Sequence, residues 1–256
     1  MPDLVPVAAP THFCKVCGTS APLYGVIDFH RSCEDARSGP LPLSGNPIYY
    51  YRCPTCGFLF TTAFDAFSHA DFSKWIYNDQ YAKIDPDYLS FRPQNNAKVV
   101  ADFVGPNFQT RILDYGSGNG TLARLLRQSG YTNVVEYDPF VPGSSVRPEG
   151  TFDCITAFEV LEHSIDPRGI VADMASLLAD PGVLLFSTCL QPENLAATGM
   201  NWWYIGPRNG HASIYSRLAL HLLGKSFNMR FGSFSDVMHV MFRSVPAFAA
   251  NRIKVQ

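Results

Sequence analysis

A glycine-rich turn between a predicted strand and a predicted helix constrains the fold of this chain more than any other feature. The turn runs from Asp114 to Gly120 with the sequence DYGSGNG, and an amphipathic segment follows at 121–129. Glycines let a backbone approach a ligand closely, and the start of a helix offers unpaired N–H groups. The turn therefore predicts an α/β fold with a ligand site where the strand ends.

The residues around this turn alternate between strand-like and helix-like segments. We expect strands at 111–114, 133–137, 152–158 and 182–188, and helices at 94–104, 121–129 and 167–178. After an aromatic loop we expect a helix at 214–223 and strands at 227–234 and 237–243. Strands that alternate with helices predict an α/β, Rossmann-like, doubly wound parallel sheet.

Two carboxylates indicate which ligand the turn receives. Asp114 stands before the first glycine, where it would repel a pyrophosphate but can accept hydrogen bonds from an ammonium group. Asp138 ends the next strand, where a carboxylate can bind both hydroxyls of a ribose. A nucleoside with a cationic amino-acid tail fits better than a dinucleotide, although dinucleotide sites use a similar turn.

These residues and the segment Glu159-Val-Leu-Glu162-His163 resemble the class I S-adenosylmethionine (SAM)-dependent methyltransferases over residues 92–190. The branch with the ubiquinone-type O-methyltransferases is the most similar one. The resemblance implies that SAM is bound by Arg92, Asp114, Gly116, Ser117, Gly118, Asn119, Gly120 and Asp138. The segment between Asp138 and Asp153 is short and lacks an obvious strand, so the residue that contacts the adenine is not assigned.

Two Cys-x-x-Cys-Gly sequences near the N-terminus predict a structural zinc site. Two residues between the thiolates let one turn present both sulfurs, and four sulfurs suit tetrahedral Zn²⁺. The four predicted ligands are Cys14, Cys17, Cys53 and Cys56. The alternative is a pair of unmetallated or disulfide-bonded motifs. The total of seven cysteines is odd, which argues against a complete disulfide framework and favours a reducing, cytoplasmic compartment.

The composition changes along the chain suggest four parts. Residues 1–12 form a flexible tail, 13–60 a zinc-ribbon-like module, 61–91 an aromatic linker of short helices, and 92–256 the SAM-dependent methyltransferase domain. The N-terminus lacks the features of a signal peptide, and no apolar run is long enough to span a membrane.

The order of these parts is similar to the zinc-containing methyltransferases, which include sugar C-methyltransferases. Their Tyr-x-Glu-His segment of catalytic residues matches Arg208-Asn-Gly210-His211 here, so the tyrosine and the acid are replaced and the histidine is retained. Tyr204 is the nearest upstream tyrosine. The resemblance implies a general base at His211, and His163 competes with it because it follows the strand that ends at 158.

Five further residues are candidates for the substrate side of the site. Trp202 and Trp203 lie in a loop, where adjacent tryptophans suit a substrate wall, and Arg208 beside them could hold an anionic group. Tyr77 and Tyr81 in the linker could close the site from the other side. The alternative for the four aromatic residues is simple packing, and the alternative for Arg208 is a solvent-exposed position.

The charge balance separates the functions that remain. Twenty basic and 22 acidic residues leave a net charge of −2, without the basic surplus of a nucleic-acid binder. A methyltransferase that acts on a small molecule (a sugar, a nucleotide sugar or a secondary metabolite) is therefore favoured over an RNA methyltransferase. A non-catalytic SAM- or nucleotide-binding protein and a nicotinamide enzyme remain as alternatives.

Overall fold

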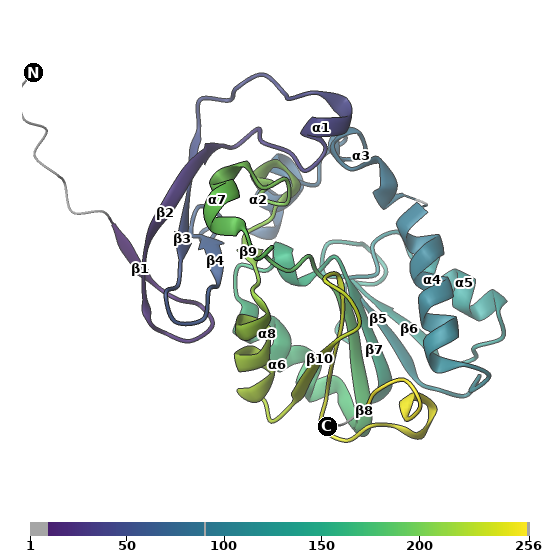
Figure 1. Ribbon diagram of the computed structural model, residues 1–256. Coiled ribbons are helices and arrows are strands. Elements are labelled where there is room, and N and C mark those ends of the chain that lie inside the picture. The colour runs from purple at the N-terminus through teal and green to yellow at the C-terminus, as the bar shows by residue number, and fades with distance from the viewer. Residues whose placement is uncertain (1–9, 90, 255–256) are drawn as a thin grey trace, which may run out of the picture.

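The computed structural model describes residues 10–89 and 91–254, which form two sheets (Figure 1). The smaller sheet is antiparallel and has five strands in the order β1-β2-β3-β4-β9. Their bounds are β1 Thr11–Phe13, β2 Ser20–Asp28, β3 Pro47–Arg52, β4 Leu59–Thr61 and β9 Ser213–Ile214. Strand β9 comes from the C-terminal part of the chain, so this sheet joins the N-terminal module to the segment that carries His211.

The larger sheet has six strands in the order β10-β11-β8-β7-β5-β6. Their bounds are β5 Ile112–Tyr115, β6 Val134–Tyr137, β7 Phe152–Phe158, β8 Leu178–Ser187, β10 Arg230–Ser233 and β11 Met238–Phe242. Strands β6, β5, β7 and β8 are parallel, which confirms the α/β fold. At the other edge, β11 runs antiparallel to both β8 and β10, and the short link between β10 and β11 makes these two strands a hairpin.

Helices cover both faces of this sheet, as a doubly wound fold requires. Helices α4 (Phe91–Val104) and α5 (Thr121–Gln128) lie on one face, and α6 (Pro167–Leu177) and α8 (Arg217–Lys225) lie on the other (Figure 1). Neighbouring residues of β5 show the alternation: Ile112 packs in the core with α4 and α5, and Leu113 packs in the core with α6 and α8.

The start of α8 differs from the sequence expectation by three residues. The hydroxyl of Ser216 accepts a hydrogen bond from the backbone N–H of Ala219, which makes Ser216 the N-cap of the helix. Residue 214, expected in this helix, instead pairs with β4 as part of strand β9.

The linker between the two sheets consists of short helices, as predicted. It contains α2 (His69–Trp75), α3 (Tyr81–Ile84) and the 3₁₀ helix η1 (Pro86–Tyr88). The other short helices are α1 (Asp35–Ser38), η2 (Leu161–His163), α7 (Leu195–Thr198), η3 (Gly199–Asn201), η4 (Pro207–Asn209) and η5 (Ala247–Ala249). Residues 11 and 12, expected in the flexible tail, belong to β1, and residues 1–9 of that tail lie outside the described residues.

The segment 139–151 between β6 and β7 contains turns but neither a helix nor a strand. Strand β6 is therefore the edge of the sheet, and this side of the molecule is formed by a loop. Within the described part of the chain, none of the helices is both long and apolar enough to cross a membrane.

Candidate active site

A cavity of about 920 Å³ opens at the carboxyl ends of β5, β6 and β7. The linker helices form the opposite wall, and the start of α4 closes one side. Ligands of doubly wound sheets bind at this edge, between neighbouring strands whose connections run to opposite faces of the sheet. The cavity is therefore the candidate active site.

The glycine turn forms the floor of the cavity and has little room for side chains. Gly116 and Gly118 both have positive φ angles (75° and 53°), which other residues rarely adopt. A Cβ atom on Gly116 would lie 2.4 Å from a methyl carbon of Val160, and one on Gly118 would lie 3.2 Å from the Tyr88 hydroxyl oxygen. These two glycines thus bring the backbone close to whatever the cavity holds.

Asp138 is held in position by two backbone N–H groups. Its Oδ2 accepts from the N–H of Gly118 and its Oδ1 accepts from the N–H of Phe140, each at 2.9 Å. The carboxylate lines the cavity, and its further lone pairs are available to hydroxyl groups of a ligand.

Asp114 and Ser117 present unpaired polar atoms to the same cavity. Asp114 is buried; its Oδ1 accepts from the Thr156 hydroxyl at 3.1 Å, whereas its Oδ2 has no hydrogen-bond partner among the described residues. The hydroxyl of Ser117 is also buried and unpartnered within that part of the chain. An ammonium or hydroxyl group of a ligand would satisfy these atoms, so the residues present fit SAM.

Asp114 should make the stability of the ligand-free protein depend on pH. Burial raises the pKa of Asp114 to about 7, above its ordinary value of 3.8. Because the folded state holds the proton more tightly, this contribution to stability is present at acidic pH and is lost as the pH rises toward 7. The expected loss is about 4 kcal/mol over the whole range, of which roughly 3 kcal/mol falls between pH 5 and pH 8.

Urea unfolding of the native protein and of the Asp114→Asn variant at pH 5 and pH 8 measures this effect. The variant should gain stability relative to the native protein between the two pH values, because asparagine does not ionise. An exposed control, Glu193→Gln, should show no such gain. An equal pH dependence in the Asp114→Asn and native proteins would contradict the raised pKa.

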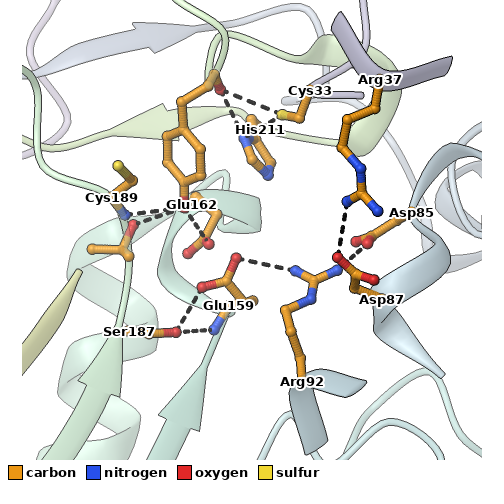
Figure 2. A network of polar contacts seen from close by, with 12 residues as sticks. Cys33, Arg37, Asp85, Asp87, Arg92, Glu159, Glu162, Ser187, Cys189 and His211 are labelled. Carbon is orange, nitrogen blue, oxygen red and sulfur yellow. Dashed lines mark hydrogen bonds and ion pairs between the residues drawn. The ribbon is translucent and has the colours of Figure 1, made fainter. Parts of the chain in front are cut away.

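Arg92 connects the linker to the end of β7 (Figure 2). Its guanidinium forms ion pairs with Asp85 and, at 3.2 Å, with Glu159. Glu159 has a φ angle of 54°, unusual for a residue other than glycine, and its side chain and backbone N–H both bond to the Ser187 hydroxyl. The arginine implied to contact the methionine carboxylate of SAM is thus paired with two acids of the protein.

Two histidines and Glu162 meet beside this ion-pair group. One ligating atom of each of Glu162, His163 and His211 lies within 4.8 Å of the others. Figure 2 shows the His211 ring directed toward Glu162 and Glu159. The Nδ1 atom of His211 lies 2.8 Å from the carbonyl oxygen of Tyr204, which can only accept, so Nδ1 carries the proton and Nε2 is free to accept one.

Burial keeps both imidazoles neutral. It lowers the pKa of His211, and burial together with the charge of His211 lowers the pKa of His163 well below 6.5. Burial raises the pKa of Glu162, and the neighbouring Glu159 raises it further. The hydroxyl of Tyr204 donates to Glu162 at 2.5 Å. Of the two histidines, His163 lines the cavity, and His211 is buried behind it.

The predicted substrate residues divide into two groups. Tyr77 and Tyr81 line the cavity, with ring centroids 5.1 Å apart. Trp202, Trp203 and Arg208 are absent from the cavity wall formed by the described residues; Trp202 is buried with Tyr204, and Trp203 is half exposed. The side chain of Asn119 is directed to the backbone, where it donates to the carbonyl of Leu89.

Sequence reasoning missed Asp85, Tyr88 and Tyr50 as parts of the site. Asp85 pairs with Arg92, Tyr88 covers Gly118, and the hydroxyl of Tyr50 donates to the backbone carbonyl of His211 at 2.6 Å. None of the three belongs to a local motif. Only the packing of distant segments brings Asp85 and Tyr88 to the cavity and Tyr50 to His211.

Arg208 fixes the turn that carries Tyr77. Its buried guanidinium donates to the carbonyl of Ile76 at 3.0 Å and to the side-chain oxygen of Asn78 at 3.1 Å. Arg208→Met keeps the volume but removes both bonds, so we expect a loss of about 1–3 kcal/mol in the free energy of unfolding. Faster amide exchange at residues 76–81 should accompany it. Unchanged stability and exchange would instead favour a direct role in substrate binding.

The four predicted zinc ligands come together at the other end of the N-terminal sheet. The sulfurs of Cys14 and Cys56 are 3.6 Å apart and those of Cys17 and Cys53 are 3.4 Å apart, and all four lie within 4.8 Å of one another. These separations are too long for disulfides and suit four thiolates about 2.3 Å from one central ion. The residues present therefore fit Zn²⁺.

The parallel α/β sheet, with a glycine turn and two acids at its carboxyl edge, defines a domain of the class I methyltransferase type. Residues 88–230 match the family model for a methyltransferase domain, and the chain belongs to this family.

Two curated relatives are ubiquinone biosynthesis O-methyltransferases. The protein from Escherichia coli is 28% identical over 126 residues, 40% of this chain and 50% of the relative. The protein from Colwellia psychrerythraea is 27% identical over 131 residues, 41% of this chain and 53% of the relative. This chain spans about half the length of the curated relatives it matches.

Two solved structures from Burkholderia thailandensis share the fold. The 1,6-didemethyltoxoflavin-N1-methyltransferase, solved with its substrate and S-adenosylhomocysteine (SAH), has a TM-score of 0.52 and 14% identity, over 79% of this chain and 97% of that chain. An O-methyltransferase family protein has a TM-score of 0.51 and 14% identity, over 70% of this chain and 64% of that chain. At this identity the likeness shows the fold alone.

Proposed function

We propose that this protein is a SAM-dependent methyltransferase that acts on a small-molecule acceptor, such as a sugar or a secondary metabolite. One observation carries the proposal: Asp114 presents an unpaired buried carboxylate oxygen on one side of the glycine turn, and Asp138 presents a fixed carboxylate on the other. This spacing of acids suits the ammonium group and the ribose of one nucleoside ligand. The family match and the SAH-bound fold relative support it.

The residues that would hold SAM are Asp114, Ser117 and Asp138, with the backbone of the glycine turn beneath. When bound, SAM supplies the electrophilic methyl group. The protein must then orient the acceptor in line with that group and exclude water. Tyr77 and Tyr81 from the linker wall are placed to do so.

We assign the general base to His163. It lines the cavity, and its lowered pKa keeps it neutral and able to accept a proton. His211 stands behind it, with its tautomer set by the Tyr204 carbonyl. In this arrangement His163 removes the acceptor proton and His211 holds the orientation of the pair.

The four-cysteine site has a structural role in this proposal. Four sulfur ligands fill the tetrahedral shell of zinc, so no position is left for a substrate. None of the four cysteines lines the cavity, and together they connect the β1–β2 turn to the β3–β4 turn. Zinc would therefore stabilise the N-terminal sheet, from which the linker helices extend to the cavity.

Calorimetric titration with SAM, SAH and NADH tests the cofactor. SAM and SAH should bind and NADH should not; the reverse would overturn the proposal. Asp138→Asn should weaken SAH binding about 10- to 100-fold, because a charged hydrogen-bond acceptor is lost. The exposed control Glu193→Gln should bind SAH like the native protein. Transfer of label from methyl-labelled SAM to a small molecule would then demonstrate the activity.

A further inference from the structure

The charged side chains of the cavity are predominantly acidic. Seven acids line it: Asp79, Asp85, Asp114, Asp138, Glu159, Asp166 and Asp173. Against them stand two arginines, Arg92 and Arg147, and two histidines, His69 and His163. Lysine is absent from the lining, as far as the structure describes the chain.

Both arginines of the cavity are already paired with acids. Arg92 bridges Asp85 and Glu159, and Arg147 lies 2.6 Å from an oxygen of Asp173 while it also donates to the Ser176 hydroxyl at 2.7 Å. The positive charge that each guanidinium could offer to an incoming phosphate is thus already offset by neighbouring acids.

Other groups that could receive an anion near the cavity are also engaged. The buried guanidinium of Arg208 donates to Ile76 and Asn78. The first turn of α6 reaches the cavity, but Asp166 caps it by accepting from the backbone N–H of Gly169 at 2.9 Å. The N–H of Gly118 is bonded to Asp138. An anionic acceptor would find no unoccupied positive group among these.

Bound cofactor would not reverse this charge. If Asp114 and Asp138 serve SAM, five acids and two arginines remain around the acceptor space. SAM itself carries a single net positive charge, which leaves an acidic excess. Electric fields in an enclosed cavity are screened less than at a surface, so the excess repels anions and attracts cations.

The wall opposite the sheet is aromatic. The ring of Phe140 lies 5.4 Å from that of Tyr77 and 5.9 Å from that of Phe72, and the His69 ring lies 4.8 Å from Phe140. Aromatic faces stack on flat rings and attract cationic groups. The wall and the acids thus favour the same kind of ligand.

We propose that the acceptor is a hydroxylated or aminated ring compound without phosphate or carboxylate groups, neutral or positively charged at pH 7. This inference rests on the proposed methyltransferase function. It excludes nucleotide-linked sugars, which the sequence alone left open, because their pyrophosphate would face an excess of acids, and both arginines of the cavity are already paired with acids.

The test uses the full-length protein, methyl-labelled SAM and a small-molecule extract of the organism that encodes the chain. Labelled product is first separated from unreacted SAM by reversed-phase chromatography and is then applied to an anion exchanger at pH 8. The label should pass through unretained; label that is retained and released only by salt would overturn the inference while leaving the methyltransferase function intact. Absence of labelled product in every fraction would contradict the proposed function itself.

A charge reversal at the mouth of the cavity provides a second measurement. Asp79→Lys replaces an exposed acid with a base. If the acceptor found in the first experiment is positively charged, its KM should rise several-fold in this variant, and 0.5 M salt should abolish the rise. If the acceptor is neutral, the variant should leave its KM unchanged. The control Glu193→Lys reverses an exposed charge outside the cavity wall and should change neither. A lower KM in the Asp79→Lys variant would contradict the inference.

Discussion

Replacing Cys56 with serine should release zinc from the protein and unfold the N-terminal module. Binding of structural zinc contributes on the order of 10–16 kcal/mol in small zinc domains, which is comparable to the whole stability of a typical domain, about 5–15 kcal/mol. Metal analysis should return about one zinc per native chain and almost none for Cys56→Ser. Thermal unfolding of the variant should show an early transition that the native protein lacks.

The same substitution should disturb the active site from a distance. The backbone carbonyl of Cys56 accepts from the Ser216 hydroxyl at 2.5 Å, and the carbonyl of Gly57 accepts from Gln191 at 2.8 Å. Tyr50, on the central strand of the module, donates to the carbonyl of His211. Loss of the metal should therefore loosen residues 191–216 and lower activity, although no cysteine of the site touches the cavity.

A matched variant separates this effect from the general loss of a thiol. Cys189→Ser changes a half-buried cysteine of the methyltransferase domain and should keep both the zinc and the stability. Full zinc occupancy in Cys56→Ser, or native-like unfolding of that variant, would disprove the four-sulfur site.

Local patterns in the sequence were sufficient to predict the glycine turn and the two acids at the end of the sheet. The glycine turn, Asp114 and Asp138 depend on features within one strand–turn–helix unit, where hydrophobic periodicity and glycine conformation determine the geometry. The two Cys-x-x-Cys-Gly sequences could likewise be interpreted locally, because each turn positions its own pair of sulfurs. Only the proximity of these two turns to each other depends on the tertiary structure.

The acceptor side depends on contacts between residues far apart in the chain, which periodicity does not reveal. Glu162 bonds to Tyr204, Arg92 bonds to Asp85 and Glu159, and Arg208 bonds to the turn at 76–78. Strand β9 has two residues, too few for any pattern, yet it places the segment with His211 against the zinc module. Arg208, a sequence candidate for binding an anionic group or for a solvated position, donates instead to the backbone and side chain of this turn.

Replacing His163 with alanine should lower kcat about 10²- to 10⁴-fold, the usual contribution of a general base. SAH affinity should stay within about twofold of the native value, because neither Asp114 nor Asp138 contacts this residue in the hydrogen-bond network. Added imidazole should restore part of the rate, since the cavity left by the side chain can admit it. His221→Ala, an exposed histidine on α8, serves as the control.

The pH profile distinguishes this base from a residue with only a structural role. Neutral imidazole accepts the proton, and burial lowers the pKa of His163 well below 6.5. The native rate should therefore stay level as the pH falls from 8 through 6.5 and decline only in more acidic solution, whereas the residual rate of His163→Ala should rise with pH as hydroxide and water replace the base. If His211→Ala instead shows the larger loss, the imidazole rescue and the altered profile, then His211 is the base and His163 positions it.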